Sequence, residues 1–373
     1  TFILEEAGEL AERMLGEFRN LDLHYAPALT GVSSGAEALR IARERGINLI
    51  ITTPHLPDMD ASELARLVQD EGLDIPVVLL AWDTRELREF EARVDTSAIE
   101  RTFLWQGDAR ILVAIVKSVE DRRNVEHDTH AVGVQVILLI EDNVRYYSSF
   151  LPVIYTELLQ HSRRVVKEGL NLSQQIMRMR ARPKILLCTT WEEAEANFDR
   201  YADDVLGIIS DVQVPREGMK SPQAGADFAK EVGAAYPDIP IILHSSRPEN
   251  ETLAESVDAN FLLKGSPLLL QELRKVMLQD FAFGDFIFKD AQGRKLTVAP
   301  DLRSLEEKLA SVPQESIIRH AGRNPFSRWL KARTEFALAH ELRPRRLADF
   351  DDVEGLRDNL IQTIKRYRLE QSQ

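Results

Sequence analysis

Five polar residues in the middle of the chain have side chains that together suit phosphoryl transfer. Each follows or closes an apolar run of the sequence, and they are Glu141, Asp142, Asp211, Ser245 and Lys264. If these runs are neighbouring strands, three carboxylates converge, and buried anions repel one another unless a cation neutralises them. Carboxylate oxygens favour a hard ion such as Mg²⁺. Beside such an ion, a hydroxyl and an ammonium are the further groups that position and stabilise a transferred phosphoryl group.

The apolar runs predict the strands that must hold these residues in place. The apolar runs lie at 134–140, 206–210, 239–245 and 261–264. Helical patterns separate them, at 192–201, 225–232 and 267–278. Strands that are apolar throughout, alternating with helices, predict a parallel sheet covered on both faces. In a doubly wound α/β sheet of this kind, chemistry collects at the carboxyl ends of the strands.

The same pattern occurs twice, because three segments of the first third of the chain recur later in the same order. Leu49–Pro57 is echoed by Gly207–Pro215, Ile75–Trp82 by Ile239–Ser246, and Phe103–Gly107 by Phe261–Gly265. Such an internal repeat decides the domain organisation. We therefore predict two doubly wound parallel-sheet domains and a mainly helical C-terminal segment with a small hairpin. The predicted boundaries are 1–123, a linker at 124–133, 134–282, and 283–373.

The second copy resembles the receiver domain of two-component response regulators over its whole length, 134–282. The residues that carry the resemblance are the Glu141-Asp142 pair, the loop Asp211-Val-Gln-Val-Pro215, Ser245 and Lys264. The resemblance implies a flavodoxin-like fold and the transfer of a phosphoryl group to Asp211 from a histidine kinase or phosphotransfer protein. It also implies that Mg²⁺ is held by Glu141, Asp142, Asp211 and the backbone carbonyl of Gln213.

The resemblance implies three further roles near the phosphoacceptor. Ser245 and Lys264 would contact the phosphoryl oxygens, and Phe261 would be the switch aromatic. The added charge would pull the Ser245 hydroxyl inward and let the Phe261 ring rotate. Two features depart from the family: Lys264 is followed by Gly-Ser-Pro where proline usually comes next, and the 215–225 loop carries extra residues.

The first copy lacks the residues that the chemistry needs. It has Thr53 in place of the aspartate, Ala81 in place of the serine and Gln106 in place of the lysine. A threonine phosphate ester is not a labile acyl phosphate, so this copy should be inactive. Glu5-Glu6 match the acidic pair. Such a pseudo-receiver is either a product of drift that retains its packing or a docking or dimerisation surface, and the sequence leaves both open.

The second copy also carries an insertion, at about 150–180, that reads as one or two apolar helices. Its apolar stripe exceeds what one receiver can bury, so we expect it to pack on another domain or on a second chain. A homodimer through this insertion or through the first receiver is the corresponding partner prediction. His161 on the insertion is interpreted as solvated or packed, and not as phosphoaccepting. His127 and His130 are interpreted as ordinary polar linker residues.

The C-terminal segment predicts a hairpin at 285–298 followed by helices at 302–310, 313–321, 325–342 and 353–368. Residues 315–346 are basic and include Phe326 and Trp329. We expect this layer to dock on the acidic receivers in preference to nucleic acid. Gly284–Phe288 and Asn324–Arg333 are similar to the region before the nucleotide-binding domain of some receiver-fused phosphoenolpyruvate synthase-like proteins. This similarity implies a regulatory front end, with catalytic domains beyond Gln373.

The amino-acid composition excludes several classes of protein. The chain has 373 residues, 44% of them hydrophobic and 29% charged, with a net charge of −13. This balance excludes a disordered chain, and the acidic surface disfavours nucleic acid. The longest apolar stretch, 132–140, is about half of what a membrane span needs. The single cysteine, Cys188, forms no internal disulfide, which points to the cytoplasm. Thr1 stands where Met would begin a complete chain, so a longer protein is expected.

Two alternatives remain open at this stage. One is a scaffold, or regulatory module of a larger enzyme, in which neither copy is phosphorylated. The other is a phosphatase of the haloacid dehalogenase type, which also has strand-end carboxylates and a lysine but needs a second acid where this chain has Gln213. Nothing in the 373 residues supplies a glycine-rich ATP loop or a swivelling phosphohistidine domain, so we expect no separate catalytic domain.

Overall fold

The computed structural model describes residues 7–21, 27–167, 175, 178, 181–321, 325–342 and 347–371. The chain divides into two compact units, Thr1–Arg123 with Asn143–Thr156, and Asn124–Asp142 with Glu157–Gln373. The predictions about Glu5 and Glu6, and about most of 168–180, lie outside the described residues. Among the residues that are described, no helix is both long and apolar enough to cross a membrane.

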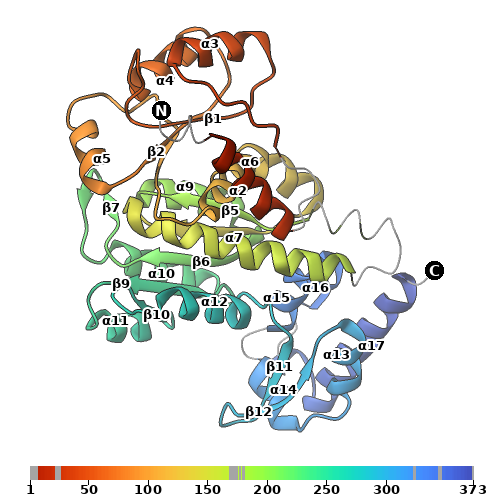
Figure 1. Ribbon diagram of the computed structural model, residues 1–373. Coiled ribbons are helices and arrows are strands. Elements are labelled where there is room, and N and C mark those ends of the chain that lie inside the picture. Colours follow the sequence, from red (N-terminus) through yellow and green to blue (C-terminus); the bar gives the residue numbers. More distant parts are fainter. Residues whose placement is uncertain are drawn as a thin grey trace. The chain divides into compact units, whose positions relative to one another are not determined.

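The first unit is built on a parallel sheet in which the three predicted strands follow one another in chain order (Figure 1). The strands are β1 (Ile50–Thr52), β2 (Val77–Ala81) and β3 (Arg101–Leu104). All five residues of β2 are buried, as expected for a central parallel strand. The helices before the last strand are α2 (Ala7–Asn20), α3 (Gly35–Glu44), α4 (Ala61–Asp70) and α5 (Thr84–Glu91).

The outer edge of β3 is closed by the beginning of helix α7 (Val144–Lys167). The backbone N–H of Leu104 donates to Ser148 Oγ at 3.0 Å, and the Tyr147 hydroxyl donates to the Thr102 carbonyl. The Tyr147 ring also meets Phe103 edge-on, with centroids 5.8 Å apart. An open strand edge would expose unpaired backbone groups, and these contacts satisfy two of them on β3.

The segment predicted as a linker is mostly helical. Helix α6 (Arg110–Val132) continues through residues 124–132 and ends before Gly133. Gly133 has a φ of +74° and its N–H bonds to the carbonyl of Thr129. The helix continues because the polar stretch contains no glycine or proline, and glycine in the left-handed conformation then terminates it. His127 and His130 are therefore residues of α6.

The second unit contains a five-stranded, wholly parallel sheet in the order β10-β9-β6-β4-β5 (Figure 1). These strands are β4 (Val136–Ile140), β5 (Lys184–Cys188), β6 (Val205–Asp211), β9 (Ile241–Ser245) and β10 (Asn260–Leu263). The strand that comes first in the chain lies between the second and the third. This is the flavodoxin-like doubly wound order, whose switch point lies between the first and third strands. The predicted fold class is confirmed.

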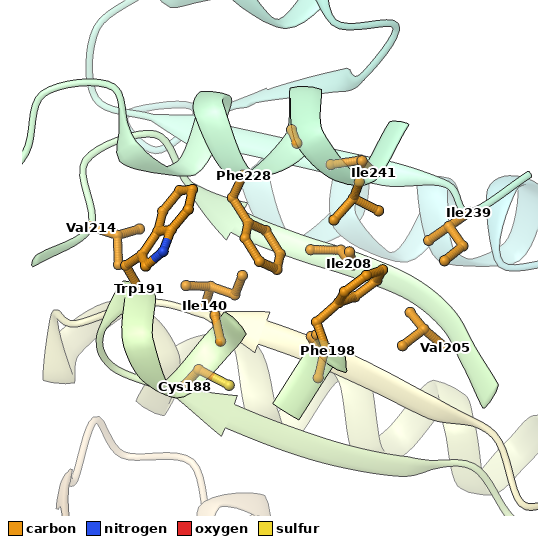
Figure 2. Packing of buried hydrophobic residues seen from close by; sticks show 14 of the residues in the cluster. Ile140, Cys188, Trp191, Phe198, Val205, Ile208, Val214, Phe228, Ile239 and Ile241 are labelled. Carbon is orange, nitrogen blue, oxygen red and sulfur yellow. The ribbon is translucent and has the colours of Figure 1, made fainter. Parts of the chain in front are cut away.

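Aromatic residues pack one face of this sheet (Figure 2). Helix α9 (Trp191–Tyr201) supplies Trp191 and Phe198, and helix α10 (Ala224–Ala235) supplies Phe228. The Phe228 ring contacts Trp191 at 5.3 Å and Phe198 at 5.8 Å, both edge-on. Such pairs add about 1 kcal/mol each beyond the area that they bury. The remaining helices of this domain are α11 (Asn250–Ser256) and α12 (Leu269–Asp280).

The C-terminal segment begins with the predicted hairpin, β11 (Phe286–Lys289) and β12 (Lys295–Ala299). Its helices are α13 (Leu302–Leu309), α14 (Gln314–Ala321), α15 (Pro325–Ala332), α16 (Phe336–Leu342) and α17 (Val353–Gln371). The prediction of one helix over 325–342 is wrong, because Thr334 has a φ of +63° and separates α15 from α16. Residues 343–346 of the basic stretch lie outside the described residues.

The aromatic residues of the basic stretch belong to the core of this segment. Phe326 and Trp329 are 3% and 1% exposed, and Phe326 stacks on Phe286 with centroids 4.8 Å apart. Two of the basic side chains contact backbone carbonyls of the sheet domain. Arg328 Nη2 donates to Asp238 O at 2.6 Å, and Lys331 Nζ donates to Asp203 O at 3.0 Å.

His161 of α7 is packed, which was one of the two predicted alternatives. Its side chain is 1% exposed and stacks on Phe283 at 4.5 Å. Its ring nitrogens lie 3.0 Å from the Phe283 carbonyl and 2.6 Å from the Ala332 carbonyl. Burial, reinforced by the charge of Arg333, lowers its pKa to about 3. A neutral imidazole without solvent access is a structural residue here.

A second buried histidine makes the stability of the C-terminal segment depend on pH. His320 Nε2 accepts the backbone N–H of Lys289 at 3.1 Å. Burial, together with the charges of Arg319 and Lys289, lowers its pKa to about 4. Below about pH 6.5, His320 is therefore protonated in the unfolded chain but not in the folded chain. Stability is full above that pH and falls as the pH drops towards 4.

We predict that His320→Gln removes part of this pH dependence. Between pH 7 and pH 5, wild type should lose about 1–2 kcal/mol more unfolding free energy than the variant. Urea unfolding at the two pH values measures the difference. His340→Gln, an exposed histidine of the same segment, is the matched control and should behave as wild type. Equal pH slopes for wild type and His320→Gln would contradict the prediction.

Candidate functional site

A buried ion triplet lies at the carboxyl end of the five-stranded sheet. Lys264 Nζ is 2.6 Å from Glu141 Oε2 and 2.6 Å from Asp211 Oδ2. The side chains of Lys264, Glu141 and Asp211 are 5%, 0% and 7% exposed. The second carboxylate oxygen of Asp211 accepts the backbone N–H of Gln213 at 3.1 Å. The structure thus brings together three of the predicted site residues from distant parts of the chain.

Strand register aligns these side chains at one edge. Strands β4 and β6 are neighbours with Ile140 opposite Ser210, so the residues that follow, Glu141 and Asp211, leave the sheet together. Strands β9 and β10 pair Ser245 with Leu263, which places Lys264 immediately beyond the same edge. Parallel strands share the direction of their carboxyl ends, and a doubly wound sheet opens a crevice there.

The carboxylates hold Lys264 in its charged form. Burial lowers the lysine pKa, but the charges of Glu141 and Asp211 outweigh burial and raise the pKa above its ordinary value. Two carboxylates and one ammonium leave the triplet with one excess negative charge. Buried charges of this kind are stable only while they remain paired. Because of this excess negative charge, the site favours binding of a further cation or attack on the electrophilic phosphorus of a phosphoryl donor.

His244 belongs to the same cluster and is not among the site residues predicted from the sequence. Its Nδ1 lies 3.5 Å from Glu141 Oε2, and its side chain is fully buried. Burial, together with the charge of Lys264, lowers its pKa well below the ordinary value, so the imidazole is neutral. The signal was a polar residue within the apolar run of β9, next to Ser245. Ligand atoms of Glu141, Asp211 and His244 lie within 4.8 Å of one another, a spacing that suits a metal ion.

The third predicted carboxylate, Asp142, has a cation partner of its own. Asp142 pairs with Lys220, whose Nζ is 3.1 Å from Asp142 Oδ2. Lys220 lies on a small hairpin of β7 (Pro215–Arg216) and β8 (Met219–Lys220), formed by the extra residues of the 215–225 loop. Its turn residues, Glu217 and Gly218, have φ values of +53° and +75°. Positive φ at both central positions is typical of a type I′ hairpin turn.

Ser245 ends β9 with its hydroxyl already engaged as an acceptor. Its Oγ accepts the backbone N–H of Arg247 at 3.1 Å and the Asn250 amide at 2.9 Å. A hydroxyl that accepts two hydrogen bonds still has its own proton to donate. Phe261, the predicted switch aromatic, is half-buried and packs against the core of the sheet. The peptide bond after Lys264 is trans, as are all those of the described residues.

The residues predicted to hold the metal offer oxygen donors that fit a hard divalent ion. The carboxylates of Glu141, Asp142 and Asp211 and the carbonyl of Gln213 are the ligand types that Mg²⁺ prefers. The imidazole of His244 is a ligand type that suits zinc, copper, iron or nickel. Two lysine ammonium groups pair with these carboxylates in this structure.

The matching positions of the first unit make only neutral contacts. Thr53 Oγ1 donates to the His55 carbonyl at 3.1 Å, and Ala81 is fully buried. Gln106 Nε2 donates to the Arg145 carbonyl at 2.9 Å. None of these three side chains is a carboxylate or an ammonium, so the first unit has no charge at these positions for phosphoryl transfer.

We predict that Lys264→Met destabilises the second unit strongly. Removing one member of a buried ion pair leaves the other charges uncompensated, which costs about 3–5 kcal/mol. Urea unfolding at pH 8 should show a loss of that size. Lys230→Met, on the exposed side of α10, should change stability by less than about 0.5 kcal/mol. A Lys264→Met protein as stable as wild type at pH 8 would refute this interpretation of the triplet.

Gly225 permits a close backbone approach behind the site, and we predict that Gly225→Ala disrupts it. A Cβ at this position would lie 1.8 Å from the Asp211 carbonyl oxygen, so the loop after β6 would have to move. We expect a loss of at least about 2 kcal/mol in unfolding free energy. The matched control is Gly233→Ala in the same helix, where a Cβ has open space and should stabilise by up to about 1 kcal/mol. Equal effects of the two substitutions would show that the close approach is unimportant.

No protein-family model matches the sequence, and no curated protein matches it either. The chain is similar to solved structures of response regulators. The Mn²⁺-bound form of the response regulator Rcp1 is 14% identical with a TM-score of 0.25, over 39% of this chain and 93% of that chain. Two response regulator/GGDEF domain proteins are each 14% identical over 72% of this chain, with TM-scores of 0.27 and 0.30 and 93% and 95% of their own chains covered. We draw no functional conclusion from likenesses this distant.

Proposed function

We propose that the second unit contains a receiver domain that is phosphorylated on Asp211 in a Mg²⁺-dependent reaction, and that the first unit is an inactive pseudo-receiver. The observation that supports this most is the buried contact of Asp211 Oδ2 with Lys264, beside Glu141 and at the switch point of the sheet. A carboxylate held there is preorganised as a nucleophile, and the ammonium can stabilise charge on a transferred group.

The positions of these side chains support the following reaction. An Asp211 carboxylate oxygen attacks the phosphorus of a phosphohistidine on a histidine kinase or phosphotransfer protein. The phosphorus–nitrogen bond breaks, and its electron pair stays with the departing imidazole. Lys264 and the hydroxyl of Ser245 then contact oxygens of the new acyl phosphate. Glu141, Asp142, Asp211 and the Gln213 carbonyl would hold Mg²⁺, which would neutralise the remaining charge.

The switch follows from the added negative charge. An acyl phosphate places nearly two negative charges beside a site that already has one in excess. The Ser245 hydroxyl can satisfy part of this charge by turning towards it, and the half-buried Phe261 can fill the space that is left. We propose that α7 and the C-terminal segment transmit this change to a partner or to a downstream domain, and that the protein acts in the cytoplasm.

We predict that acetyl phosphate and Mg²⁺ add one phosphoryl group to the protein. Intact mass spectrometry should detect a single adduct that alkali removes, as expected for an acyl phosphate. Asp211→Asn should abolish the adduct. Asp227→Asn, an exposed aspartate of α10, is the matched control and should retain it. Omission of Mg²⁺ should reduce the adduct at least tenfold.

Each alternative function gives a different result in the same experiment. A scaffold would show no adduct in the wild-type protein. A phosphatase of the haloacid dehalogenase type would release free phosphate steadily from generic substrates. A second adduct that survives Asp211→Asn and is lost with Thr53→Val would show that the first unit is active after all.

A further inference from the structure

The hairpin beside the site is fixed to the sheet domain by contacts of its own. The backbone N–H of Glu217 donates to Glu192 Oε1 at 2.7 Å, and the Arg216 guanidinium lies 4.0 Å from the centroid of the Trp191 ring. The hydrogen bond from Glu217 lowers the pKa of Glu192, which keeps this acceptor ionised. Both anchors lie at the start of α9, so the hairpin is held at its turn while its second strand leads back towards the site.

Lys220 is the last residue of this second strand, and its ammonium contacts Asp142, a predicted metal ligand. Its ammonium lies 3.1 Å from one oxygen of Asp142 and 3.4 Å from the other. The Lys220 side chain is 53% exposed, whereas that of Asp142 is 22% exposed. A long, half-exposed lysine can leave its partner by rotation of its own bonds and regain water without movement of the backbone.

We propose that Lys220 is an internal cation that competes with the divalent ion for Asp142 and so sets the ion concentration at which the site becomes loaded. This inference rests on the function proposed above. The Lys220 ammonium contacts both oxygens of Asp142, so a divalent ion that bound either oxygen would lie close to a like charge and be repelled by it. Binding of the ion therefore requires that the Lys220 ammonium moves away. The hairpin itself stays in place, because its anchors are Glu192 and Trp191.

The competition differs in kind from the action of Lys264. Lys264 is 5% exposed and bridges two carboxylates, so it is a permanent part of the buried charge balance. The pair between Lys220 and Asp142 is partly solvated, and exposed pairs of this type are worth roughly 0.2–1 kcal/mol. Such a pair is weak enough for a divalent ion to break and strong enough to shift its affinity measurably.

The test is calorimetric titration of the full chain with magnesium chloride. Lys220→Ala should tighten binding roughly two- to fivefold, which is the fold-change that corresponds to an exposed ion pair. Lys220→Glu should tighten it further, because a carboxylate then replaces the competing cation. Lys230→Ala, an exposed lysine of α10, is the matched control and should bind as wild type. In an Asp142→Asn background, Lys220→Ala should give no gain, because the pair is already broken.

Two outcomes would overturn the proposal, and they are distinguishable. If wild type binds Mg²⁺ and both Lys220 variants bind it equally well, Lys220 does not compete, while the phosphoacceptor function of Asp211 stands. If neither wild type nor any variant binds Mg²⁺ and Asp211 is not phosphorylated, the proposed function fails and the inference fails with it. Both Lys220 substitutions are at an exposed position, so a folding defect should not obscure the result.

Discussion

The contact of one lysine ammonium with two buried carboxylates is the interaction on which the site depends. Glu141 and Asp211 lie at the ends of adjacent strands, where their charges would repel each other strongly in the protein interior. Lys264 from the edge strand lies 2.6 Å from both. Because each charge is hidden from water, none of the three is stable without the others. The strand order brings these three side chains to the same edge of the sheet.

Packing behind the sheet makes the position of Asp211 reliable. The aromatic residues Trp191, Phe198 and Phe228 of α9 and α10 pack in one buried cluster with Ile140 of β4 and Ile208 of β6, as Figure 2 shows. Helix α10 begins close enough to the Asp211 carbonyl that only glycine is tolerated at position 225. Because the loop after β6 is fixed by these contacts, the Asp211 carboxylate is held in one geometry. A preorganised catalytic group requires such a fixed position.

The two units show how architecture and chemistry separate. Both have parallel strands in the same relative order, built from the matching segments of the sequence. In the first unit, neutral Thr53, Ala81 and Gln106 follow or end those strands. A parallel sheet needs only apolar strands and covering helices, whereas phosphoryl transfer needs charges at fixed points. A sheet of this kind can therefore be packed without such charges at its strand ends.

The sequence by itself determined the apolar runs that form the strands and the polar residues at their carboxyl ends, because these follow from local pattern. The meeting of Glu141, Asp211 and Lys264 could be predicted only on the condition that those strands are neighbours, and the tertiary structure supplied the strand order. Tertiary structure alone decided that Asp142 pairs with Lys220, that His244 joins the cluster, and that Thr334 divides the helix predicted over 325–342. These outcomes depend on which side chains meet across long separations in the chain, and on local backbone conformations selected by packing. Periodicity carries no information about such partners.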